Sequence, residues 1–514
     1  MEKNQISRFK LNSEIPPYRS IFIGILQGTW NEMGVQYGQR CAKDIARNWD
    51  MVWNVDVLGG GLFERLWQKG RSSREARINY VLPYMERYIK ELSFLSPELV
   101  EFFKGMGEGA AKELDKCTDA DICSHLIKTA TLNFADLALH PNWDFVDDRP
   151  GTAAEKKVSA TIEGHDCNSM WVRGKATKTG ETYAARTVQA GHLTPEGKDG
   201  FWNRQVAYVA VPKDPSARVF WGQGTAGNLG GLGGGLLNDN GLCCLTSGCS
   251  YSEQNWKEAD ETTAPGIRDF VLASYGVIFS KSAAEATEKI TVGTENYRKR
   301  SGRKTVLRAR GANIVFADAN EAFCVEQNAR HYDVRRPGDE GEKGGDYIVT
   351  ANHFKCENGS FDENNVYHPD RPMARYEPEN RESTLASYDR FWSGMWMISN
   401  NYGNIDSEMV MRDFMASHYG YDKEGKRYDP EDSNAPAEIV RKHFSGTFCC
   451  HIEPFDEKHP LGVGGNANTS VFNLSTREVW WVPVWPCHYK EWNMDWDYLD
   501  LKPFSEYRKM LWGY

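Results

Sequence analysis

The stretch that decides the fold of this chain reads Gly164-His165-Asp166-Cys167-Asn168-Ser169-Met170. The sequence before it reads as helical and then polar, and the sequence after it reads as a long succession of hairpins. Cys167 therefore stands at a junction, and a cut of the Asp166–Cys167 bond would make it the first residue of a new chain. Its freed α-amine would lie beside its own sulfur and could serve as a general base.

Composition limits the classes of protein to which the chain can belong. Its 514 residues, 40% of them hydrophobic and 12% aromatic, suffice for two domains or for one large layered domain with a prosegment. The formal net charge is −10, with acidic and basic residues mixed along the chain. This mixture argues against nucleic acid or an anionic membrane surface as a partner. No run of about 18 apolar residues occurs, so no spanning helix is expected.

The N-terminus and the cysteines predict a cytoplasmic protein. The first residues, Met1-Glu2-Lys3-Asn4-Gln5, lead into a polar stretch without the apolar core of a secretory signal. The 12 cysteines are therefore expected to stay reduced. The only tight clusters are Cys243-Cys244 and Cys449-Cys450-His451, and adjacent cysteines cannot both easily ligate one zinc. We expect no metal site and no cofactor.

Residues 1 to about 140 are expected to be mostly helical. One helix should begin near Glu32, a second should span 80–92, and a third should start at Ser96-Pro97-Glu98, with Ser as the cap and Pro in the first turn. Small residues within 99–111 would let the third helix pack closely against a neighbour. The polar residues 141–163 are interpreted as an exposed linker.

After Cys167 the pattern predicts three hairpins and a helical stretch. The hairpins span 169–188, turning at Thr179-Gly180; 312–325, turning at 318–321; and 469–482, turning near Ser475-Thr476. The helical stretch covers 265–290. Strands and helices in this order favour two sheets packed face to face with helices outside. The glycine-rich stretch 227–235 lacks the Lys-Ser/Thr ending of a P-loop, so we interpret it as a flexible loop.

Six segments resemble, in order, those of a known family. They are Gly28-Thr29-Trp30-Asn31-Glu32-Met33-Gly34-Val35-Gln36-Tyr37-Gly38, Lys104-Gly105-Met106-Gly107-Glu108-Gly109-Ala110, Ala185-Arg186-Thr187-Val188, Asn238-Asp239-Asn240-Gly241-Leu242, Thr350-Ala351-Asn352-His353-Phe354, and Val479-Trp480-Trp481-Val482 with Trp485-Pro486-Cys487. Together they resemble the penicillin acyltransferase-like family of autoproteolytic N-terminal nucleophile (Ntn) hydrolases, distant relatives of the choloylglycine (bile salt) hydrolases. The resemblance covers residues from about 28 to about 490.

The resemblance implies an α+β fold, a four-layer αββα Ntn-hydrolase sandwich. Residues 1–166 would be a mostly helical prosegment, which becomes the α-subunit after cleavage, and residues 167–514 the αββα catalytic domain, or β-subunit. The chain would be a zymogen that cuts itself between Asp166 and Cys167, and its two pieces would stay associated. Whether it forms a homo-oligomer is left open.

The resemblance also implies site residues. Cys167 is the nucleophile, whose thiolate attacks an amide or thioester carbonyl. Asn352 matches the position whose side-chain N–H points at the developing oxyanion, and Asn238 begins a turn that would face the same site. Arg186 matches a position near the nucleophile, where it can lower a thiol pKa or hold substrate. Arg375 resembles an arginine that binds substrate or forms an ion pair.

Each of these roles has a plainer alternative. Asn238 and Asn352 could be ordinary turn residues, and Arg186 a solvated strand residue. The chain also departs from the family pattern. Gln189 stands where the family often has an Asp that binds the free α-amine, and Gln stabilises an ammonium less well than a carboxylate does. Asp166 replaces the usual Gly before the nucleophile.

The sequence thus predicts a cysteine hydrolase that cleaves the amide bond of a small N-acylated molecule through a thioester acyl-enzyme. An acyltransferase that passes the acyl group, for example from an acyl-CoA, to an amine would share that intermediate. A non-catalytic, ligand-binding protein that is never processed is an alternative from another class, and Gln189 and Asp166 favour it.

Overall fold

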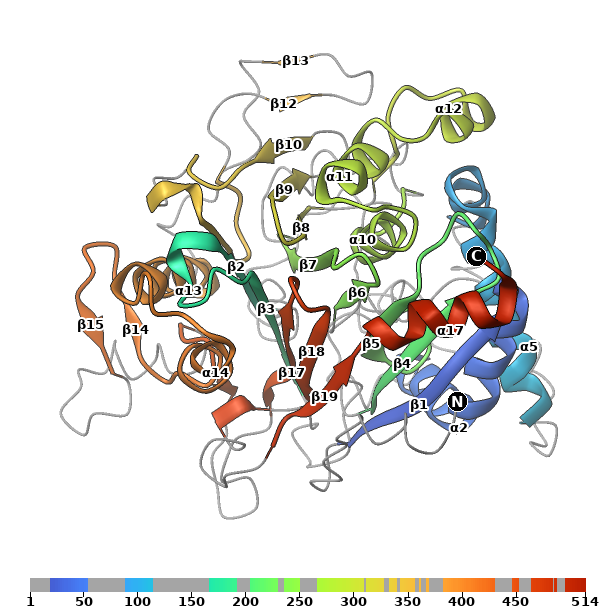
Figure 1. Ribbon diagram of the computed structural model, residues 1–514, viewed down its shortest axis with the longest axis horizontal. Helices are drawn as coiled ribbons and strands as arrows, with labels where there is room; N and C mark the ends of the chain where they lie inside the picture. Colours follow the sequence, from blue (N-terminus) through green and yellow to red (C-terminus); the bar gives the residue numbers. More distant parts are fainter. Residues whose placement is uncertain are drawn as a thin grey trace, which may run out of the picture.

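The structure is a computed structural model of the chain. It describes residues 19–53, 88–113, 166–191, 204–229, 235–249, 266–308, 311–327, 332–339, 343–355, 360–361, 367–368, 382–429, 446–452, 464–483, 485–487 and 495–514. Two sheets lie face to face in the middle of the molecule, and helices flank them on both outer sides (Figure 1).

The larger sheet has ten strands. In spatial order they are β1 (Arg19–Gly28), β4 (Arg204–Pro212), β5 (Phe220–Thr225), β6 (Leu236–Asn238), β7 (Cys243–Gly248), β8 (Ala312–Ala317), β9 (Ala322–Gln327), β10 (Tyr332–Arg335), β12 (Ser360–Phe361) and β13 (Tyr367–His368). All neighbouring pairs are antiparallel except β1 and β4, which run parallel.

The smaller sheet carries the predicted junction. Its strands are β11 (Tyr347–Thr350), β2 (Asp166–Val172), β3 (Tyr183–Gly191), β17 (Gly464–Asn473), β18 (Glu478–Val482) and β19 (Asp497–Asp500), with β16 (His451–Ile452) paired to β17. The three predicted hairpins are confirmed as β2–β3, β8–β9 and β17–β18, each antiparallel.

Helices cover the outer face of each sheet. On the larger sheet lie α2 (Trp30–Trp53), α5 (Pro97–Glu113), α10 (Asp269–Ile278) and α11 (Ala283–Thr291), followed by α12 (Glu295–Ser301). On the smaller sheet lie α13 (Glu382–Asn400), α14 (Ser407–Met409) and the π-helix η6 (Val410–Phe414). The remaining elements are η2 (Gly174–Ala176), η4 (Lys343–Gly345), the hairpin β14 (Gly420–Tyr421) and β15 (Arg427–Tyr428), and α17 (Lys502–Trp512). The predicted four-layer αββα sandwich is confirmed.

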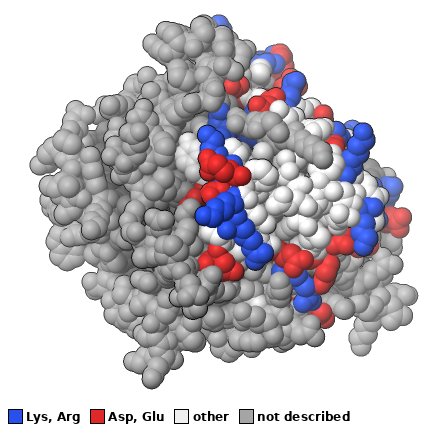
Figure 2. Space-filling model, turned by 90° about the vertical axis from the view of Figure 1, so that its left-hand side faces the viewer, with Lys and Arg blue, Asp and Glu red and all other residues white. Residues whose placement is uncertain are grey.

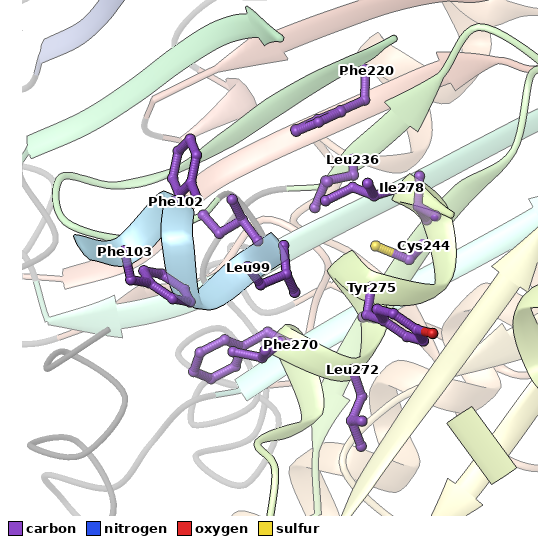
Figure 3. Close-up of a cluster of buried hydrophobic side chains, with 14 of the residues drawn as sticks. Leu99, Phe102, Phe103, Phe220, Leu236, Cys244, Phe270, Leu272, Tyr275 and Ile278 are labelled. Carbon is purple, nitrogen blue, oxygen red and sulfur yellow. The ribbon is translucent and has the colours of Figure 1, made fainter. Parts of the chain in front are cut away.

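Each contact between layers contains an apolar cluster. Figure 3 shows the contact between α5, α10 and the larger sheet, where Phe102 and Phe103 of α5 lie in one cluster with Phe220, Leu236 and Tyr275. Between the sheets, Trp221 packs on Phe472 and Trp481, with ring centroids 5.8 and 5.3 Å away. Burial of such large side chains is the main favourable term in the stability of the fold.

The described part of the N-terminal region is mostly helical, as expected, but it also contains one strand that was not predicted. It contributes β1, an edge strand of the larger sheet, whose partner β4 lies far along the chain. Helix α2 begins at Trp30, slightly before the predicted Glu32, because Thr29 caps it: Glu32 Oε2 accepts from Thr29 N at 2.8 Å while Thr29 Oγ1 accepts from Glu32 N at 3.3 Å. This reciprocal pair is a capping box.

The other predicted helices have mixed outcomes. Ser96 caps α5, since its Oγ accepts from Leu99 N at 3.3 Å. The expected single helix over 265–290 is two helices, because Ser282 accepts from Glu285 N and so starts a new one. Of the helix expected at 80–92, residues 88–95 are described and helical. The expected linker at 141–163 lies outside the described residues.

Helices α2 and α5 approach so closely that four glycines are required between them. A Cβ at Gly34 would lie 2.1 Å from the Phe102 carbonyl oxygen, and one at Gly38 would lie 2.0 Å from that of Met106. Gly105 and Gly109 lie on α5, and a Cβ at either position would lie 2.1 or 2.2 Å from a backbone carbonyl oxygen of α2. The prediction of close packing through small residues is confirmed.

We expect Gly34→Ala to destabilise the protein although alanine favours helix formation. The new methyl group would clash with a backbone carbonyl, and separating two packed helices typically costs about 1–3 kcal/mol, more than the roughly 1 kcal/mol gained in helix propensity. Thermal unfolding should show a lower midpoint. Lys112→Ala, at an exposed position of α5, is the control and should change stability by less than about 0.5 kcal/mol. An unchanged midpoint in Gly34→Ala would contradict the packing argument.

Charges of both signs share the described surface. Figure 2 shows Lys and Arg lying among Asp and Glu on the described part of one face, as expected from a sequence in which acidic and basic residues are mixed. Among the described residues, no helix is both long and apolar enough to cross a membrane.

Candidate active site

Strand β2 directs Cys167 toward the space between the two sheets. Met170 and Val172 pack with the helices outside the smaller sheet, whereas Trp171 packs between the sheets. Because side chains alternate along a strand, Cys167 and Ser169 share the inner face with Trp171. Cys167 is 4% exposed, so its thiol lies in the interior of the sandwich at the start of β2.

The strand register shows that this inner face changes from polar to apolar along β2. The row at the start of the strand holds Cys167, Val188 and Asn468. The next inner row holds Thr350, Ser169, Arg186 and Ser470, and the one after it holds Ile348, Trp171, Ala184 and Phe472. Polar side chains therefore gather at the Cys167 end, and aromatic core fills the other end.

Side chains of the two sheets hydrogen-bond to one another at the polar end. Asn468 Nδ2 donates to Gln205 Oε1 at 3.1 Å, and Ser470 Oγ donates to Gln223 Oε1 at 2.8 Å. These residues form an inter-sheet polar cluster, defined as Cys167, Ser169, Arg186, Gln205, Gln223, Asn468 and Ser470.

Several buried polar atoms facing this region have no hydrogen-bond partner among the described residues. They are Ser247 Oγ, Gln223 Nε2, Asn313 Oδ1 and Asn468 Oδ1. A buried polar group left unsatisfied costs about 1–3 kcal/mol, so such groups are rare and call for an explanation. They offer donors and acceptors to a polar group that enters between the sheets.

Asn352 contacts the nucleophile residue directly. The backbone N–H of Cys167 donates to Asn352 Oδ1 at 2.8 Å, and Asn352 Nδ2 donates to the Gly248 carbonyl at 2.8 Å. The backbone N–H of Asn352 donates to Ser387 Oγ at 2.8 Å. The sequence predicted that Asn352 belongs at this site. Its side-chain oxygen, however, faces the nitrogen that cleavage would convert into an α-amine.

Sequence reasoning missed Arg390 and Ser387, which lie on α13. Arg390 is fully buried and donates through one terminal nitrogen to Asn352 Oδ1 at 2.8 Å. Ser387 and Arg390 are three residues apart, so one face of α13 presents both to Asn352. The only signal in the sequence was the helical spacing of Ser387 and Arg390. That spacing does not reveal that both side chains contact Asn352.

His353, next to Asn352, is a neutral positioning group. Its Nδ1 lies 2.8 Å from Ser387 Oγ, and its ring stacks on Tyr388 at a centroid distance of 4.0 Å. Burial, and then the cations of Lys355, Arg335 and Arg390, hold the pKa of His353 well below its usual value. Since the imidazole stays uncharged, Arg390 carries the positive charge at Asn352.

Arg186 lies on the same inner face as Cys167, two residue pairs further along the hairpin. It pairs with Ser169, and only 5% of its surface is exposed. The alternative interpretation as a solvated strand residue is therefore wrong. A buried guanidinium on this face favours negative charge nearby.

Gln189 lies on the other face of the hairpin. It pairs with Asp166, outside the inner row of Cys167 and Val188, and its Nε2 donates to the Thr447 carbonyl at 3.2 Å. Its side chain therefore braces the loop around Thr447. Asn168, whose side chain is buried on that same face, has both polar atoms without a partner among the described residues.

Asn238 is a turn residue. Its Nδ2 donates to the carbonyls of Val277 and Ser280, and its Oδ1 accepts from the backbone N–H groups of Asn240 and Leu242. Both side-chain N–H groups are thus directed at α10 and the residues after it, which leaves none to point at an oxyanion. The predicted catalytic role is replaced by the plainer one, because the tertiary contact with α10 uses the donors.

Asn238→Ala should therefore reduce stability and leave chemistry intact. Loss of the side chain leaves buried carbonyl and N–H groups unpaired, at a cost of about 1–3 kcal/mol. Denaturant unfolding should show a lower midpoint, with Asn240→Ala, at an exposed position of the same turn, as the milder control. A strong loss of turnover in folded, stable Asn238→Ala would restore the catalytic assignment.

Two further predictions fall outside what the structure describes. Arg375 lies outside the described residues, and so do residues 230–234 of the glycine-rich stretch. Residues 227–229 lie beside α2, where Tyr37 Oη accepts from Gly227 N at 3.2 Å.

Comparison with known proteins finds distant structural likeness. Two variants of conjugated bile acid hydrolase from Clostridium perfringens are similar to this chain, with 11% and 12% sequence identity and TM-scores of 0.32 and 0.31; each covers 66% of this chain and 93% of its own. Penicillin V acylase from Agrobacterium tumefaciens shares 10% identity with a TM-score of 0.24, and the match covers 62% of this chain and 83% of the acylase.

No family model and no curated protein sequence matches the chain. At these identities and TM-scores, the chemistry has to be read from the residues around Cys167.

Proposed function

We propose that the chain is an Ntn-type cysteine amidohydrolase, which frees Cys167 by self-cleavage and then hydrolyses the amide bond of a small N-acylated molecule. The observation that carries the proposal is the 2.8 Å hydrogen bond from Cys167 N to Asn352 Oδ1. This hydrogen bond positions the Cys167 nitrogen, which self-cleavage would convert into the α-amine that acts as the general base. Because structural buried cysteines are inert, the proposal depends on this contact at the Cys167 amide.

The first reaction would be intramolecular. Cys167 Sγ attacks the Asp166 carbonyl carbon, and the peptide nitrogen of Cys167 leaves with a proton, so that a thioester replaces the amide. Water then attacks the thioester. The Asp166 carboxylate and the Cys167 thiol are released, and the α-amine of Cys167 is free.

Turnover would use the same atoms. The α-amine takes the thiol proton, and Sγ attacks the substrate amide carbon. The tetrahedral intermediate collapses as the amine product leaves with that proton, and an acyl thioester remains. The α-amine next removes a proton from water, which attacks the thioester and releases the acid.

Two buried arginines support a negatively charged intermediate at this site. Arg390 contacts Asn352, and Arg186 lies on the inner face two residue pairs from Cys167. Fixed positive charge in a water-poor interior stabilises developing oxyanions more than it would in water. The unpaired polar atoms of Ser247, Gln223, Asn313 and Asn468 could bind the amide or carboxylate of a small substrate.

Hydrolysis and acyl transfer are separated by what attacks the thioester. Purified, processed protein is incubated with a panel of N-acyl amines, and the acid and amine products are quantified by mass spectrometry. We expect equal amounts of acid and amine, together with a transient acyl adduct on the Cys167 piece. If no free acid forms and a new N-acyl amine appears only when an acceptor amine is added, the protein is an acyltransferase.

The non-catalytic alternative has one observation in its favour. Gln189 braces the Thr447 carbonyl from the outer face, so no carboxylate stands where the family often uses one. Intact mass of purified protein distinguishes the two classes, because a ligand-binding protein of this kind would remain a single chain with no acyl adduct.

A further inference from the structure

A second cluster of chemically reactive side chains lies away from Cys167, outside the smaller sheet. His418, Cys449 and Cys487 each present one ligand atom, and these three atoms all lie within 4.8 Å of one another. His418 follows η6, Cys449 precedes β16, and Cys487 follows β18, so three segments far apart in sequence converge here. The sequence argument against a metal site was that the adjacent residues Cys449 and Cys450 cannot both bind one ion. That argument does not apply to this cluster, because Cys450 is not part of it.

The atom types and their spacing match a zinc site. Zinc binds thiolate sulfur at about 2.3 Å and imidazole nitrogen at about 2.0–2.1 Å in tetrahedral geometry, which sets ligand atoms about 3.5–3.8 Å apart. The observed upper limit of 4.8 Å needs only side-chain rotation to reach that spacing. A site with two thiolate sulfurs and one imidazole nitrogen selects zinc over magnesium or calcium, which bind oxygen ligands.

Backbone contacts hold two of the ligand segments together independently of any metal. The N–H of Cys449 donates to the carbonyl of Ser417, the residue before His418, at 3.0 Å. Asn466 clamps the same loop from β17: its Oδ1 accepts from Cys450 N at 3.0 Å, and its Nδ2 donates to the Phe448 carbonyl at 3.0 Å. The position of Cys449 is thus set in advance, as a binding site requires.

The third segment is held by a close approach at Gly465. This residue has φ +136°, and a Cβ there would lie 2.0 Å from the Cys450 carbonyl oxygen and 2.3 Å from Trp485 Nε1. Only glycine lets the Trp485–Cys487 segment and the Cys449 loop meet over β17. The thiols of Cys449 and Cys487 are buried, and His418 is partly exposed, so a metal ion could enter from the His418 side.

We propose that His418, Cys449 and Cys487 bind one zinc ion, with water in the fourth position. Both thiols lose their protons to solvent when the metal binds, so two protons are released for each ion. The ion would tie the Cys449 loop to the segments after η6 and β18. That loop also carries Thr447, whose carbonyl accepts from Gln189, the residue opposite Asp166. The metal would therefore stabilise the strand pair β2–β3, which carries Cys167. The proposed zinc site does not depend on the proposed hydrolase function.

The test uses the full chain, treated with chelator and reductant and then exposed to Zn²⁺, with the bound metal measured by elemental analysis after gel filtration. We expect one zinc per chain in wild type and in the matched control Cys450→Ser. Cys449→Ser and Cys487→Ser should bind zinc at least roughly 10- to 100-fold more weakly, since even loss of a residue that only hydrogen-bonds a metal ligand costs that much. Co²⁺ in place of Zn²⁺ should give sulfur-to-cobalt charge-transfer absorption in wild type, where both thiols are present. This absorption should be weaker in Cys449→Ser and in Cys487→Ser.

His418→Gln keeps the test decisive if a cysteine variant does not fold, because His418 is partly exposed and its loss leaves both thiols in place. Its zinc affinity should fall by a similar factor. The proposal is overturned if reduced wild type takes up no zinc, or if His418→Gln and the cysteine variants bind zinc as wild type does. It is also overturned if thiol counting finds Cys449 and Cys487 joined as a disulfide and zinc is still not bound after reduction.

Discussion

Cys167→Ala will remain one chain of 514 residues, whereas wild type will separate under denaturing conditions into pieces of 166 and 348 residues (514 − 166 = 348). Alanine keeps the backbone of β2 and its hydrogen bond to Asn352 but removes the sulfur that attacks the Asp166 carbonyl. Intact-mass spectrometry gives both the number of pieces and the position of the cut. Turnover of N-acyl substrates should fall to the background rate, because no thioester can form.

Cys324→Ala is the matched control, since Cys324 is also fully buried between the sheets. It should be processed and active even if it is less stable. Cleavage of Cys167→Ala at the same bond would show that Cys167 is not the nucleophile of self-cleavage. A wild-type chain that stays intact would support the ligand-binding alternative.

Asn352→Ala should lower turnover by about 10²–10³-fold, the usual loss when one oxyanion donor is removed, while KM changes much less. The same substitution removes the acceptor for Cys167 N and for Arg390, so self-cleavage should also slow. To separate the two steps, residues 1–166 and a piece that begins at Cys167 are produced together as two chains. Steady-state kinetics on this pre-cut protein then measures hydrolysis alone.

Asn352→Asp distinguishes the two roles of this side chain. Aspartate keeps an oxygen for the Cys167 nitrogen and for Arg390 but has no N–H to donate. If the donor matters most, Asn352→Asp should be as slow as Asn352→Ala. If holding the α-amine matters most, Asn352→Asp should retain much more activity. Near-normal turnover in folded, pre-cut Asn352→Ala would refute both roles.

Local sequence signals predicted three hairpins and several helices correctly, but they did not predict most of the other described strands or the helices α12, α13 and α17. Alternating strands around Thr179-Gly180 and 318–321 predicted the hairpins β2–β3 and β8–β9, and Ser96-Pro97 marked the start of α5. These signals work because a turn, a cap or an alternation involves atoms within a few residues of one another. The same signals missed β1, since an edge strand is recognised by its partner, and β4 lies far away in the sequence.

The sequence by itself predicted the layered fold, the strand that carries Cys167, and the nearness of Asn352 and Arg186 to that strand. Only the tertiary structure decided which atoms meet. It brought Arg390 and Ser387 of α13 to Asn352, directed the donors of Asn238 to α10, and gathered His418, Cys449 and Cys487 from three segments. The physical reason is that backbone propensity and periodicity act over a few residues, whereas a site is made by side chains whose nearness depends on how whole layers pack.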